Sequence, residues 1–380
     1  MKILMIYPQI DGPLGTNHGI ASLAGVLHAN DHVMDLMHVS EKHLGIPSSA
    51  ELIDYIRDTE PGLVGFSVMS QQYDWVVEQS KAIRAAFPEL VQTIGGVHCT
   101  MVPDEVHKSK LFDYVCVGEG DWALLELMDS LEKGERPHTL SNFRSWMGSV
   151  PVSNPVAPFP ELEKLPPLDY DIFDMKAVIK ETRGWMGILT SRGCPYKCTY
   201  CFNIEIVDQY IEDGAAKNVK EFLRHFPIDV LMGDLKKLLR ENPQINTFIF
   251  DDDLFTLNTD YVIEFCEAYI KHEVNTPFVV NGHVNCFDEP AARALKEAGC
   301  IIVKFGLESG SNRVRREVLK RFMKNEQIER SFYAAHAYDL HSSAFIMIGL
   351  PYESREEVME TIRLCAKVKM GRFRWALFFP

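Results

Sequence analysis

The sequence is poor in three features that would each point to a common functional class. It has no run of the roughly 18 apolar residues that a membrane-spanning helix needs, so we expect no membrane span. Basic residues are outnumbered, 39 against 53 acidic ones, and the net charge of −14 argues against a general affinity for nucleic acid. The N-terminus, MKILMIYPQI, leads into a strand-like segment without a small-residue cleavage site. We therefore expect a cytoplasmic protein.

A disulfide framework is also missing. The nine cysteines are an odd number, spread through a long chain that has no secretory signal. What is present is an ordinary globular composition, with 46% hydrophobic and 24% charged residues. The length of 380 residues predicts two domains.

Residues 1–141 alternate between strand-like and helix-like segments. The strand-like segments are 2–7, 32–37, 63–69, 90–94 and 113–117, and the helix-like ones are 16–29, 49–59, 74–86 and 121–133. We expect Asp121 to cap the last of these helices and Gly134 to end it. Alternation of this kind predicts an α/β domain with an open parallel sheet, flavodoxin-like or Rossmann-like.

Residues 142–183 form a different kind of segment. Six prolines crowd between Pro151 and Pro167, and the hydrophobic periodicity fades. We expect a proline-rich, extended linker between two domains.

Alternation resumes over residues 184–380. The strand-like segments are 185–191, 247–250, 278–281, 301–305, 344–348 and 374–379. Asp288, followed by Pro290 and later by Gly299, delimits one helix, and a capping box at Ser354–Glu357 begins another. Sequential βα units predict a parallel barrel or part of one. The chain stops directly after the sixth strand, which suggests a truncated C-terminus.

The strongest motif is SRGCPYKCTYC, which contains Cys194, Cys198 and Cys201. Random placement of nine cysteines would give only about 0.005 such patterns. The motif follows the first strand of the second half, at the carboxyl end where such folds carry chemistry. Three thiolates in one loop can hold three irons of a [4Fe–4S] cluster and leave the fourth iron open. A structural zinc site requires a fourth ligand, and no further Cys or His lies nearby in the sequence. A redox pair of Cys198 and Cys201 is a further alternative.

This motif, C-x3-C-x-aromatic-C, resembles the cluster motif of the radical S-adenosylmethionine enzymes, and the resemblance covers the whole second half. It implies a partial (β/α)6 TIM-type barrel, with Cys194, Cys198 and Cys201 as cluster ligands and Tyr200 beside the adenine. It also implies that S-adenosylmethionine chelates the open iron through its amino and carboxylate groups. Reductive cleavage would then give methionine and a 5′-deoxyadenosyl radical.

Three more segments resemble strand signatures of one large subfamily, namely 248–255 (FIFDDDLF), 306–311 (GLESGS) and 349–353 (GLPYE). The resemblance implies that they line the cleft near the methionine and ribose of the cofactor. It assigns contacts with S-adenosylmethionine to Asp252, Glu308, Ser309 and Gly349.

The same residues allow other interpretations. Asp251–Asp253 could cap the next helix or bind a divalent ion, and Gly349 could serve only a turn. A charged residue such as Glu308 at a strand end is favoured for catalysis in barrels. His283 stands where the subfamily often has arginine, and a solvated or core histidine is an equal alternative.

The first half resembles the cobalamin-binding domain that precedes the radical domain in this subfamily. The matching residues are Gly15, Ser67, Met69, Gly95, Gly96, Gly118 and Glu119. Small residues at strand ends let the backbone approach a long nucleotide tail. None of the 13 histidines lies in a D-x-H-x-x-G pattern, so either cobalamin binds without a histidine ligand or the domain has lost this cofactor, and we expect the former. Gly118-x-Gly120-x-x-Ala123 also fits a dinucleotide turn, but it follows the fifth strand instead of the first.

Together these resemblances imply a cobalamin-dependent radical methyltransferase, acting on an unactivated carbon or phosphorus centre of a small molecule, lipid or peptide. The implied cofactors are a [4Fe–4S] cluster, S-adenosylmethionine and cobalamin, and the implied partner is an electron donor such as flavodoxin or ferredoxin. An oxidative cyclase or rearrangement enzyme, similar to the anaerobic porphyrin-ring cyclases, is the alternative. A methylthiotransferase is less favoured because the first half has only Cys99 and Cys116. A non-catalytic cobalamin or iron–sulfur sensor is disfavoured by the cleft signatures.

Overall fold

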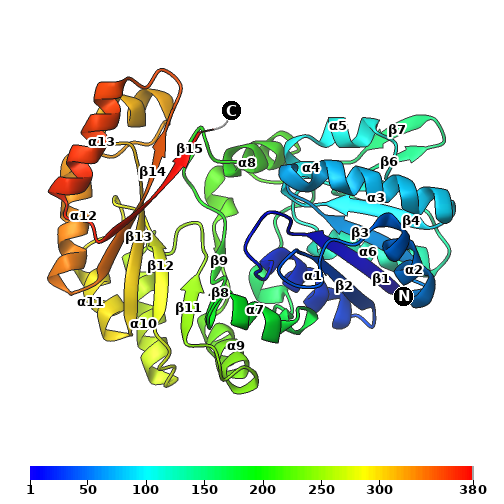
Figure 1. Cartoon of the computed structure of the whole chain (residues 1–380), viewed down its shortest axis with the longest axis horizontal. Coiled ribbons are helices and arrows are strands. Elements are labelled where there is room, and N and C mark those ends of the chain that lie inside the picture. Colours follow the sequence, from blue (N-terminus) through cyan, green and yellow to red (C-terminus); the bar gives the residue numbers. More distant parts are fainter. Residues whose placement is uncertain (379–380) are drawn as a thin grey trace. The chain divides into compact units, whose positions relative to one another are not determined.

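The computed structural model describes residues 1–378, which form two compact units (Figure 1). Unit 1 comprises Met1–Arg183 and Glu205–Glu221, and unit 2 comprises Gly184–Ile204 and the chain from Phe222 onward. Among the described residues, no helix combines the length and apolar character needed to cross a membrane.

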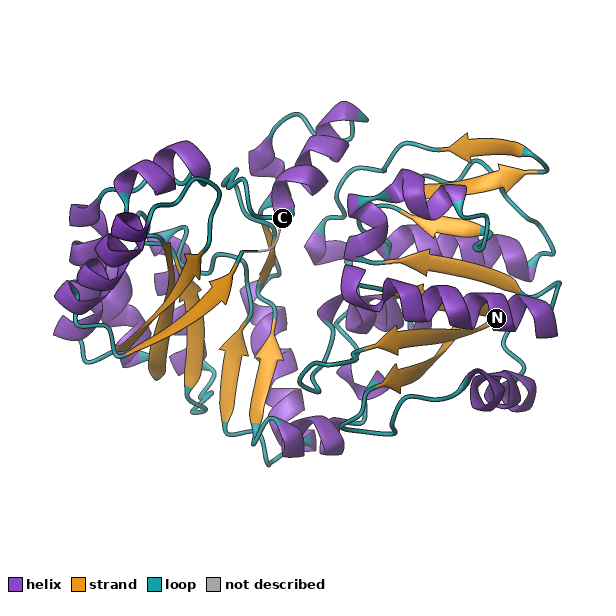
Figure 2. Ribbon diagram, turned by 45° about the horizontal axis from the view of Figure 1, so that its top comes forward, coloured by secondary structure: helices purple, strands orange, loops and turns teal. Residues whose placement is uncertain are grey.

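Unit 1 is built on a seven-stranded sheet in the order β2-β1-β3-β4-β5-β6-β7, with helices on both faces (Figure 2). Its strands are β1 (Lys2–Pro8), β2 (Val33–Val39), β3 (Leu63–Ser67), β4 (Val91–Gly95), β5 (Tyr114–Cys116), β6 (Phe143–Met147) and β7 (Val150–Ser153). Its helices are α1 (His18–His28), α2 (Ser49–Thr59), α3 (Tyr73–Ala86), α4 (Val97–Met101), α5 (Pro103–Lys108), α6 (Asp121–Glu132), α7 (Met175–Glu181) and most of α8 (Asn203–Glu212). The first five strands are parallel, so their carboxyl ends share one edge.

The segment expected to be an extended linker differs from that expectation. Strands β6 and β7 form an antiparallel hairpin that continues the sheet from β5, with Tyr114 opposite Ser145, and α7 follows later in the segment. Pro151 hid the hairpin from sequence reasoning, because proline weakens a strand prediction. It is tolerated here because β7 is the edge strand of the sheet.

The expected cap of α6 is also wrong. Gly120 occupies the N-cap position and makes no side-chain cap, and Asp121 is the first helical residue. The Asp121 carboxylate is buried and accepts a hydrogen bond from the Ser22 hydroxyl of α1, at 2.5 Å. It therefore joins two helices instead of capping one. Gly134, with φ of 79°, does lie just beyond the end of the helix.

Unit 2 contains a six-stranded, all-parallel sheet in the order β8-β11-β12-β13-β14-β15, and this confirms the predicted α/β half-barrel. Its strands are β8 (Trp185–Ile188), β11 (Thr247–Phe250), β12 (Phe278–Gly282), β13 (Cys300–Glu308), β14 (His341–Ile348) and β15 (Arg372–Leu377). A short antiparallel pair, β9 (Ser191–Arg192) and β10 (Arg224–His225), follows β8. The last predicted strand extended to Phe379, which lies outside the described residues.

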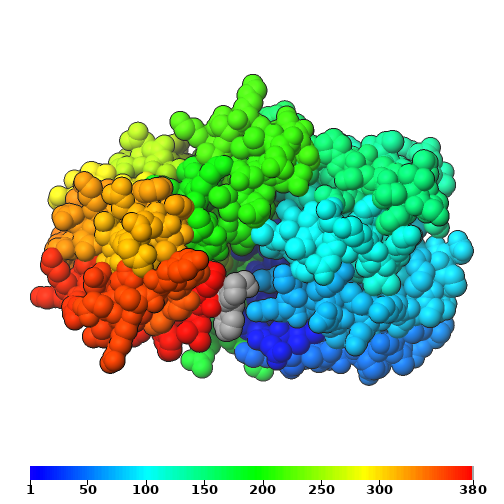
Figure 3. All heavy atoms as spheres, turned by 90° about the horizontal axis from the view of Figure 1, so that it is seen from above, coloured from blue at the N-terminus to red at the C-terminus, as the bar shows by residue number. Residues whose placement is uncertain are grey.

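Helices cover the outer face of the unit 2 sheet (Figures 1 and 2). They are α9 (Ile228–Glu241), α10 (Thr259–Lys271), α11 (Glu289–Glu297), α12 (Asn325–Ala337) and α13 (Arg355–Lys367), and the last two appear as orange to red surface atoms in Figure 3. Two predicted caps are confirmed. Asp288 accepts from the Ala291 amide at the start of α11, and Ser354 and Glu357 form a reciprocal capping box at the start of α13.

Candidate functional site

The three motif cysteines lie in the loop that follows β9, at the carboxyl edge of the unit 2 sheet. All three thiols are free, and Cys198 is buried whereas Cys194 and Cys201 are partly exposed. The loop passes close to its neighbour at Gly193, whose φ is 90° and where a Cβ atom would lie only 2.3 Å from the Phe222 carbonyl oxygen. Only glycine fits that position, so the backbone itself fixes where the thiols begin.

Without a metal, the thiols of Cys194 and Cys201 are poorly ionised. Burial raises the pKa of Cys194 to about 12 and also raises the pKa of Cys201. Bound iron would offset that cost, because a metal cation stabilises the thiolate. Across residues 1–378, no three His, Cys, Asp or Glu side chains converge closely enough to hold one ion. As a donor set, three thiols in one loop suit a cluster in which each thiolate binds a separate iron.

Arg321 connects the cysteine loop to the end of β13. One guanidinium nitrogen, Nη1, lies 3.6 Å from the Cys198 sulfur and 3.3 Å from the Tyr200 hydroxyl. The other, Nη2, donates to the Gly306 carbonyl at 2.7 Å. The structure thus brings Cys198 and Tyr200 together with the segment that carries Glu308.

Glu308 ends β13 in an unusual backbone conformation. Its φ is 63°, and the register with β14 shifts between Gly306 and Glu308. The side chain is buried, and burial raises its pKa, although the charge of Arg321 and a hydrogen bond from Tyr200 oppose the shift. A left-handed conformation at a non-glycine residue is costly and is typical of functional sites.

Asp252 is placed differently from Glu308. It follows β11 and is fully buried, and its carboxylate accepts hydrogen bonds from the Thr190 amide and hydroxyl and from the Ser191 hydroxyl. Burial raises its pKa to about 6, and these hydrogen bonds oppose the shift. Asp252 does not cap the next helix, because Asn258 is the N-cap of α10. It holds the start of the cysteine loop against β11.

Ser309 also turns inward. It is fully buried, its hydroxyl accepts from the Ser311 amide at 3.2 Å, and it lies 3.5 Å from the Thr361 hydroxyl of α13. Gly349 has φ of 81° and open space around its missing side chain, so its conformation serves the turn after β14. The next residue, Leu350, packs in a small hydrophobic cluster that includes Tyr200 and Val318.

Unpaired polar atoms mark the same edge of unit 2. Three buried side-chain atoms have no hydrogen-bond partner, namely Asn281 Oδ1 and His283 Nε2 at the end of β12 and Arg321 Nε in the segment before α12. Unpaired buried polar groups are rare and need an explanation, and a polar ligand such as S-adenosylmethionine supplies one. The residues present therefore fit that cofactor.

His283 supports the middle of the cysteine motif. Its ring stacks on Tyr196, with centroids 4.3 Å apart, and its Nδ1 accepts from the Asn285 amide. The side chain is buried, which together with the nearby charge of Arg321 lowers its pKa to about 3. His283 is thus a neutral core histidine with one free nitrogen, not a solvated one.

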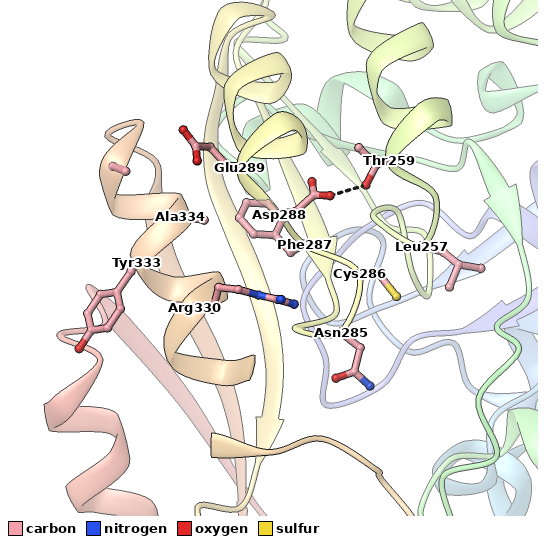
Figure 4. A pocket seen from close by; sticks show the side chains of 11 residues that line it. Leu257, Thr259, Asn285, Cys286, Phe287, Asp288, Glu289, Arg330, Tyr333 and Ala334 are labelled. Carbon is pink, nitrogen blue, oxygen red and sulfur yellow. Dashed lines mark hydrogen bonds between the residues drawn. The ribbon is translucent and has the colours of Figure 1, made fainter. Parts of the chain in front are cut away.

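A surface cavity of about 650 Å³ adjoins this region (Figure 4). Arg330 extends from α12 toward the loop with Asn285 and Cys286, and Asp288 accepts from the Thr259 hydroxyl at 3.1 Å. The Cys286 sulfur lies 3.3 Å from the Tyr196 hydroxyl, so the cavity wall reaches the cysteine motif. None of the residues predicted as site residues lines this cavity.

In unit 1 the predicted cobalamin residues lie at or beyond the carboxyl ends of β1, β3, β4 and β5. The Gly15 amide donates to Gln9 Oε1 just ahead of α1, and Met69 is 53% exposed after β3. Ser67 and Gly95 are the last residues of β3 and β4. Gly96 has φ of 97°, and a Cβ atom there would lie 2.7 Å from both the nitrogen and the oxygen of Val68. At Gly96, therefore, the close approach is between two loops of the protein.

Gly118 and Glu119 follow β5 and contact α8. A Cβ atom on Gly118, whose φ is 78°, would lie 2.5 Å from the Tyr210 hydroxyl, and the same hydroxyl accepts from the Glu119 amide at 2.8 Å. Tyr210 is buried and stacks on Phe159, with centroids 3.8 Å apart. The glycine therefore makes room for a tyrosine of the chain itself.

This edge also carries unpaired polar atoms. Gln72 Oε1 and His98 Nε2 are buried without a partner, and the other nitrogen of His98 lies 3.0 Å from the Ser70 hydroxyl. A ligand rich in amide groups, such as cobalamin, could satisfy both, so the residues present fit that cofactor as well.

Sequence reasoning missed Arg321, Asn281 and Tyr210. Arg321 lies in an irregular segment that follows a short π-helix at Val314–Val318, where no periodicity places a side chain. A π-helix is frequent near functional sites, yet it leaves no clear trace in the sequence. Tyr210 could have been suspected only from the glycine that makes room for it.

Two family models match the chain. The model described as the radical SAM superfamily matches residues 188–365, and the one described as the B12 binding domain matches residues 12–128. The two matches fall on the second and first halves of the chain, respectively.

Curated relatives span the whole chain. An uncharacterized methyltransferase of Pyrococcus horikoshii is 26% identical over 390 aligned residues, which cover 100% of this chain and 81% of that protein. The anaerobic magnesium-protoporphyrin IX monomethyl ester cyclase of Rubrivivax gelatinosus is 22% identical over 396 residues, covering 100% and 68%.

A solved structure shares the fold. The radical S-adenosylmethionine methyltransferase TsrM of Kitasatospora setae superposes with a TM-score of 0.80 at 15% identity, over 99% of this chain and 73% of that one. That protein has been solved with tryptophan and an S-adenosylmethionine analogue, and with cobalamin and a [4Fe–4S] cluster.

Proposed function

We propose that this chain, which belongs to the radical SAM superfamily and carries a B12-binding domain in its first half, transfers a methyl group to an unactivated carbon or phosphorus centre. Its cofactors are a [4Fe–4S] cluster, S-adenosylmethionine and cobalamin. When bound, the cluster and S-adenosylmethionine supply a 5′-deoxyadenosyl radical, and cobalamin supplies the methyl group.

One observation carries this proposal. Three free thiols lie in one loop at the carboxyl edge of a parallel sheet, and unpaired polar atoms surround the same edge. Parallel α/β folds place their reactive groups at that edge. A purely structural loop would not need three thiols beside several buried polar atoms that have no hydrogen-bond partner.

Different residues of unit 2 hold the cluster, position the cysteine loop and contact S-adenosylmethionine. Cys194, Cys198 and Cys201 hold the cluster, while Asp252 fixes the start of their loop through Thr190 and Ser191. The Tyr200 ring, packed near Leu350, offers an apolar face beside which a flat adenine can lie. The free atoms of Asn281 and His283 accept or donate the hydrogen bonds of the polar end of the cofactor.

Unit 1 binds cobalamin at its own carboxyl edge. The switch in strand order lies between β1 and β3, where open α/β sheets bind ligands. Gly15 follows β1, Ser67 ends the neighbouring strand β3, and Met69 follows β3. Gln72 and His98 supply the polar contacts, and no D-x-H-x-x-G histidine takes part.

Methyl transfer is favoured over the alternatives by the methyltransferases among the relatives. The substrate is a small molecule, lipid or peptide, and the electron donor is a small redox protein such as flavodoxin or ferredoxin. The nine free cysteines fit a reducing compartment such as the cytoplasm.

Isotope transfer tests the proposal without a known substrate. Reconstituted, reduced protein is incubated with trideuteromethyl S-adenosylmethionine, and the protein-bound cobalamin is extracted and analysed by mass spectrometry. We expect the label in the cobalamin fraction of the wild type. A protein that cleaves S-adenosylmethionine but never transfers the label would contradict the methyltransferase proposal.

An oxidative cyclase is the second candidate, and the cyclase of Rubrivivax gelatinosus that spans the whole chain favours it. A cyclase would consume S-adenosylmethionine without placing its methyl group in any product. The label experiment therefore separates the two functions directly.

A further inference from the structure

Arg321 is held against the cysteine motif more firmly than a solvent-facing arginine would be. It is only 8% exposed, and its two terminal nitrogens contact three groups: the Cys198 sulfur, the Tyr200 hydroxyl and the Gly306 carbonyl. The contact with Gly306 is short, at 2.7 Å, and uses Nη2, whereas the contact with the sulfur uses Nη1. The guanidinium is therefore anchored from β13 and aimed at Cys198.

The backbone makes room for this arrangement. A Cβ atom on Gly306 would lie 2.6 Å from both Nη2 of Arg321 and Oε1 of Glu308, so any larger residue there would displace the guanidinium and the carboxylate. Gly306 belongs to a segment that sequence reasoning assigned to the cofactor cleft. In the structure the absence of a side chain at Gly306 leaves room for Arg321 and for the Glu308 carboxylate.

The segment that carries Arg321 is also tied to the cysteine loop. The Thr199 amide donates to the Leu319 carbonyl at 3.1 Å, and the Thr199 hydroxyl donates to the Val318 carbonyl at 2.7 Å. Thr199 follows Cys198 directly. The distance between Arg321 and the Cys198 sulfur is thus fixed by hydrogen bonds on both sides of the contact.

A permanent positive charge at this place has a defined electrostatic effect. Arginine stays protonated in proteins, and its N–H groups donate only. A donor beside a cluster thiolate stabilises the reduced cluster, which carries one more negative charge, more than the oxidised cluster. Hydrogen bonds to the sulfurs and nearby charge are the means by which a protein sets a cluster's reduction potential.

We infer that Arg321 is a positioning residue that raises the reduction potential of the [4Fe–4S] cluster through the Cys198 sulfur, and so eases its reduction. The inference rests on the proposed role of Cys194, Cys198 and Cys201 as cluster ligands. The property affected is the midpoint potential of the cluster, so it can be measured without a substrate.

The test is a redox titration of the anaerobically reconstituted full chain, followed by electron paramagnetic resonance in the absence of S-adenosylmethionine. Arg321→Gln removes the charge, and Arg321→Lys keeps it. Arg315→Lys is the matched control, because Arg315 is buried in the same segment and donates to the Ser309 and Met323 carbonyls instead of a cysteine.

For Arg321→Gln we expect a midpoint about 59 mV lower, which corresponds to a tenfold smaller ratio of reduced to oxidised cluster at a given potential. Arg321→Lys should keep more than half of the wild-type effect, and Arg315→Lys should leave the midpoint unchanged. A fully loaded Arg321→Gln cluster with the wild-type midpoint would overturn the inference.

A second measurement covers the case in which Arg321→Gln does not fold or bind iron. Wild-type protein labelled with ¹⁵N-arginine is reduced, and pulsed electron paramagnetic resonance is used to detect a weak nitrogen coupling to the cluster. We expect the coupling in the wild type and its loss in Arg321→Lys; no coupling in the wild type would overturn the inference. A wild-type chain that binds no [4Fe–4S] cluster would instead overturn the proposed function, and the inference with it.

Discussion

Both units have their candidate site at the carboxyl edge of parallel strands, but the groups that form the two sites differ in kind. In unit 2 the edge carries reactive side chains: three thiols, the buried carboxylates of Asp252 and Glu308, and the guanidinium of Arg321. In unit 1 it carries mostly backbone and small residues, with Gly96 and Gly118 in positive-φ conformations. The difference fits the two tasks, because a cluster needs covalent ligands whereas a large organic cofactor needs surface and hydrogen bonds.

The glycines of unit 1 that the motif assigns to cobalamin make their closest contacts within the protein. A Cβ atom on Gly96 would meet Val68, and one on Gly118 would meet Tyr210, so neither glycine faces open space. These glycines therefore allow close packing between parts of the protein at this edge. A ligand would contact the surface that this packing forms. In unit 2, by contrast, the motif residues Cys194 and Cys201 are themselves partly exposed.

The largest expected difference between the units is in iron binding. Cys198→Ala should reduce the iron content of reconstituted protein from about four atoms per chain to near zero, because two thiolates cannot hold the cluster. Cys266→Ala, which removes a buried thiol from α10, should keep its iron. Equal iron in the two variants would place the metal elsewhere. Iron and sulfide analysis gives the answer.

The next effect belongs to unit 1. Gly96→Val should lower the free energy of unfolding by about 3 kcal/mol, because the side chain meets Val68 backbone atoms and the φ of 97° disfavours any β-branched residue. It should also weaken the retention of cobalamin on gel filtration while leaving the iron content unchanged.

Gly134→Val provides the control for Gly96→Val. Gly134 has a similar φ of 79° but nothing within 4 Å of the added atom, so only the conformational cost remains. We expect a loss of about 1 kcal/mol and normal cobalamin retention. If both variants lost the same stability in chemical denaturation, the contact with Val68 would carry no weight.

The unfolding free energy is expected to depend on pH through His283 of unit 2. The pKa of His283 is lowered to about 3 in the folded chain, so between that value and its ordinary value near 6.5 only the unfolded chain binds the proton. The unfolding free energy of the iron-free protein should therefore decrease as the pH falls through this window, by about 1 kcal/mol per pH unit from this group.

His283→Phe isolates that contribution, because phenylalanine keeps the stacking on Tyr196 but cannot titrate. Urea denaturation between pH 7 and pH 4 should show a shallower slope for the variant than for the wild type. Parallel slopes would mean that His283 is accessible to protons in the folded chain.

The smallest effect again lies in unit 1. Tyr210→Phe removes the hydroxyl that accepts from the Glu119 amide and should cost about 1 kcal/mol of unfolding free energy. Phe159 would still stack on the ring, so the change should stay local. A loss several times larger would show that Tyr210 supports more of unit 1 than the turn after β5.

Sequence reasoning succeeded where a residue's identity carries its role. The Asp288 cap and the Ser354–Glu357 capping box are local patterns, and both form as predicted. The alternation of strands and helices gave the class of both halves, because hydrophobic period reports the burial of each element.

It failed where a role depends on distant partners. Asp121 looked like a cap, but its carboxylate bonds to Ser22, which lies 99 positions away in the sequence. Arg321 meets Cys198 across 123 positions, and the strand that contains Pro151 is acceptable only because it lies at a sheet edge. Contacts of this kind form only in the assembled fold, and no local sequence pattern predicts them.

The most direct test of the central claim is the reductive cleavage of S-adenosylmethionine by the loop of Cys194, Cys198 and Cys201. Reconstituted protein is reduced under strictly anaerobic conditions, S-adenosylmethionine is added, and 5′-deoxyadenosine is quantified beside the Cys198→Ala and Cys266→Ala variants. We expect 5′-deoxyadenosine from the wild type and from Cys266→Ala, and only background from Cys198→Ala. Equal amounts from wild type and Cys198→Ala, or none from a wild type with a full cluster, would contradict the account.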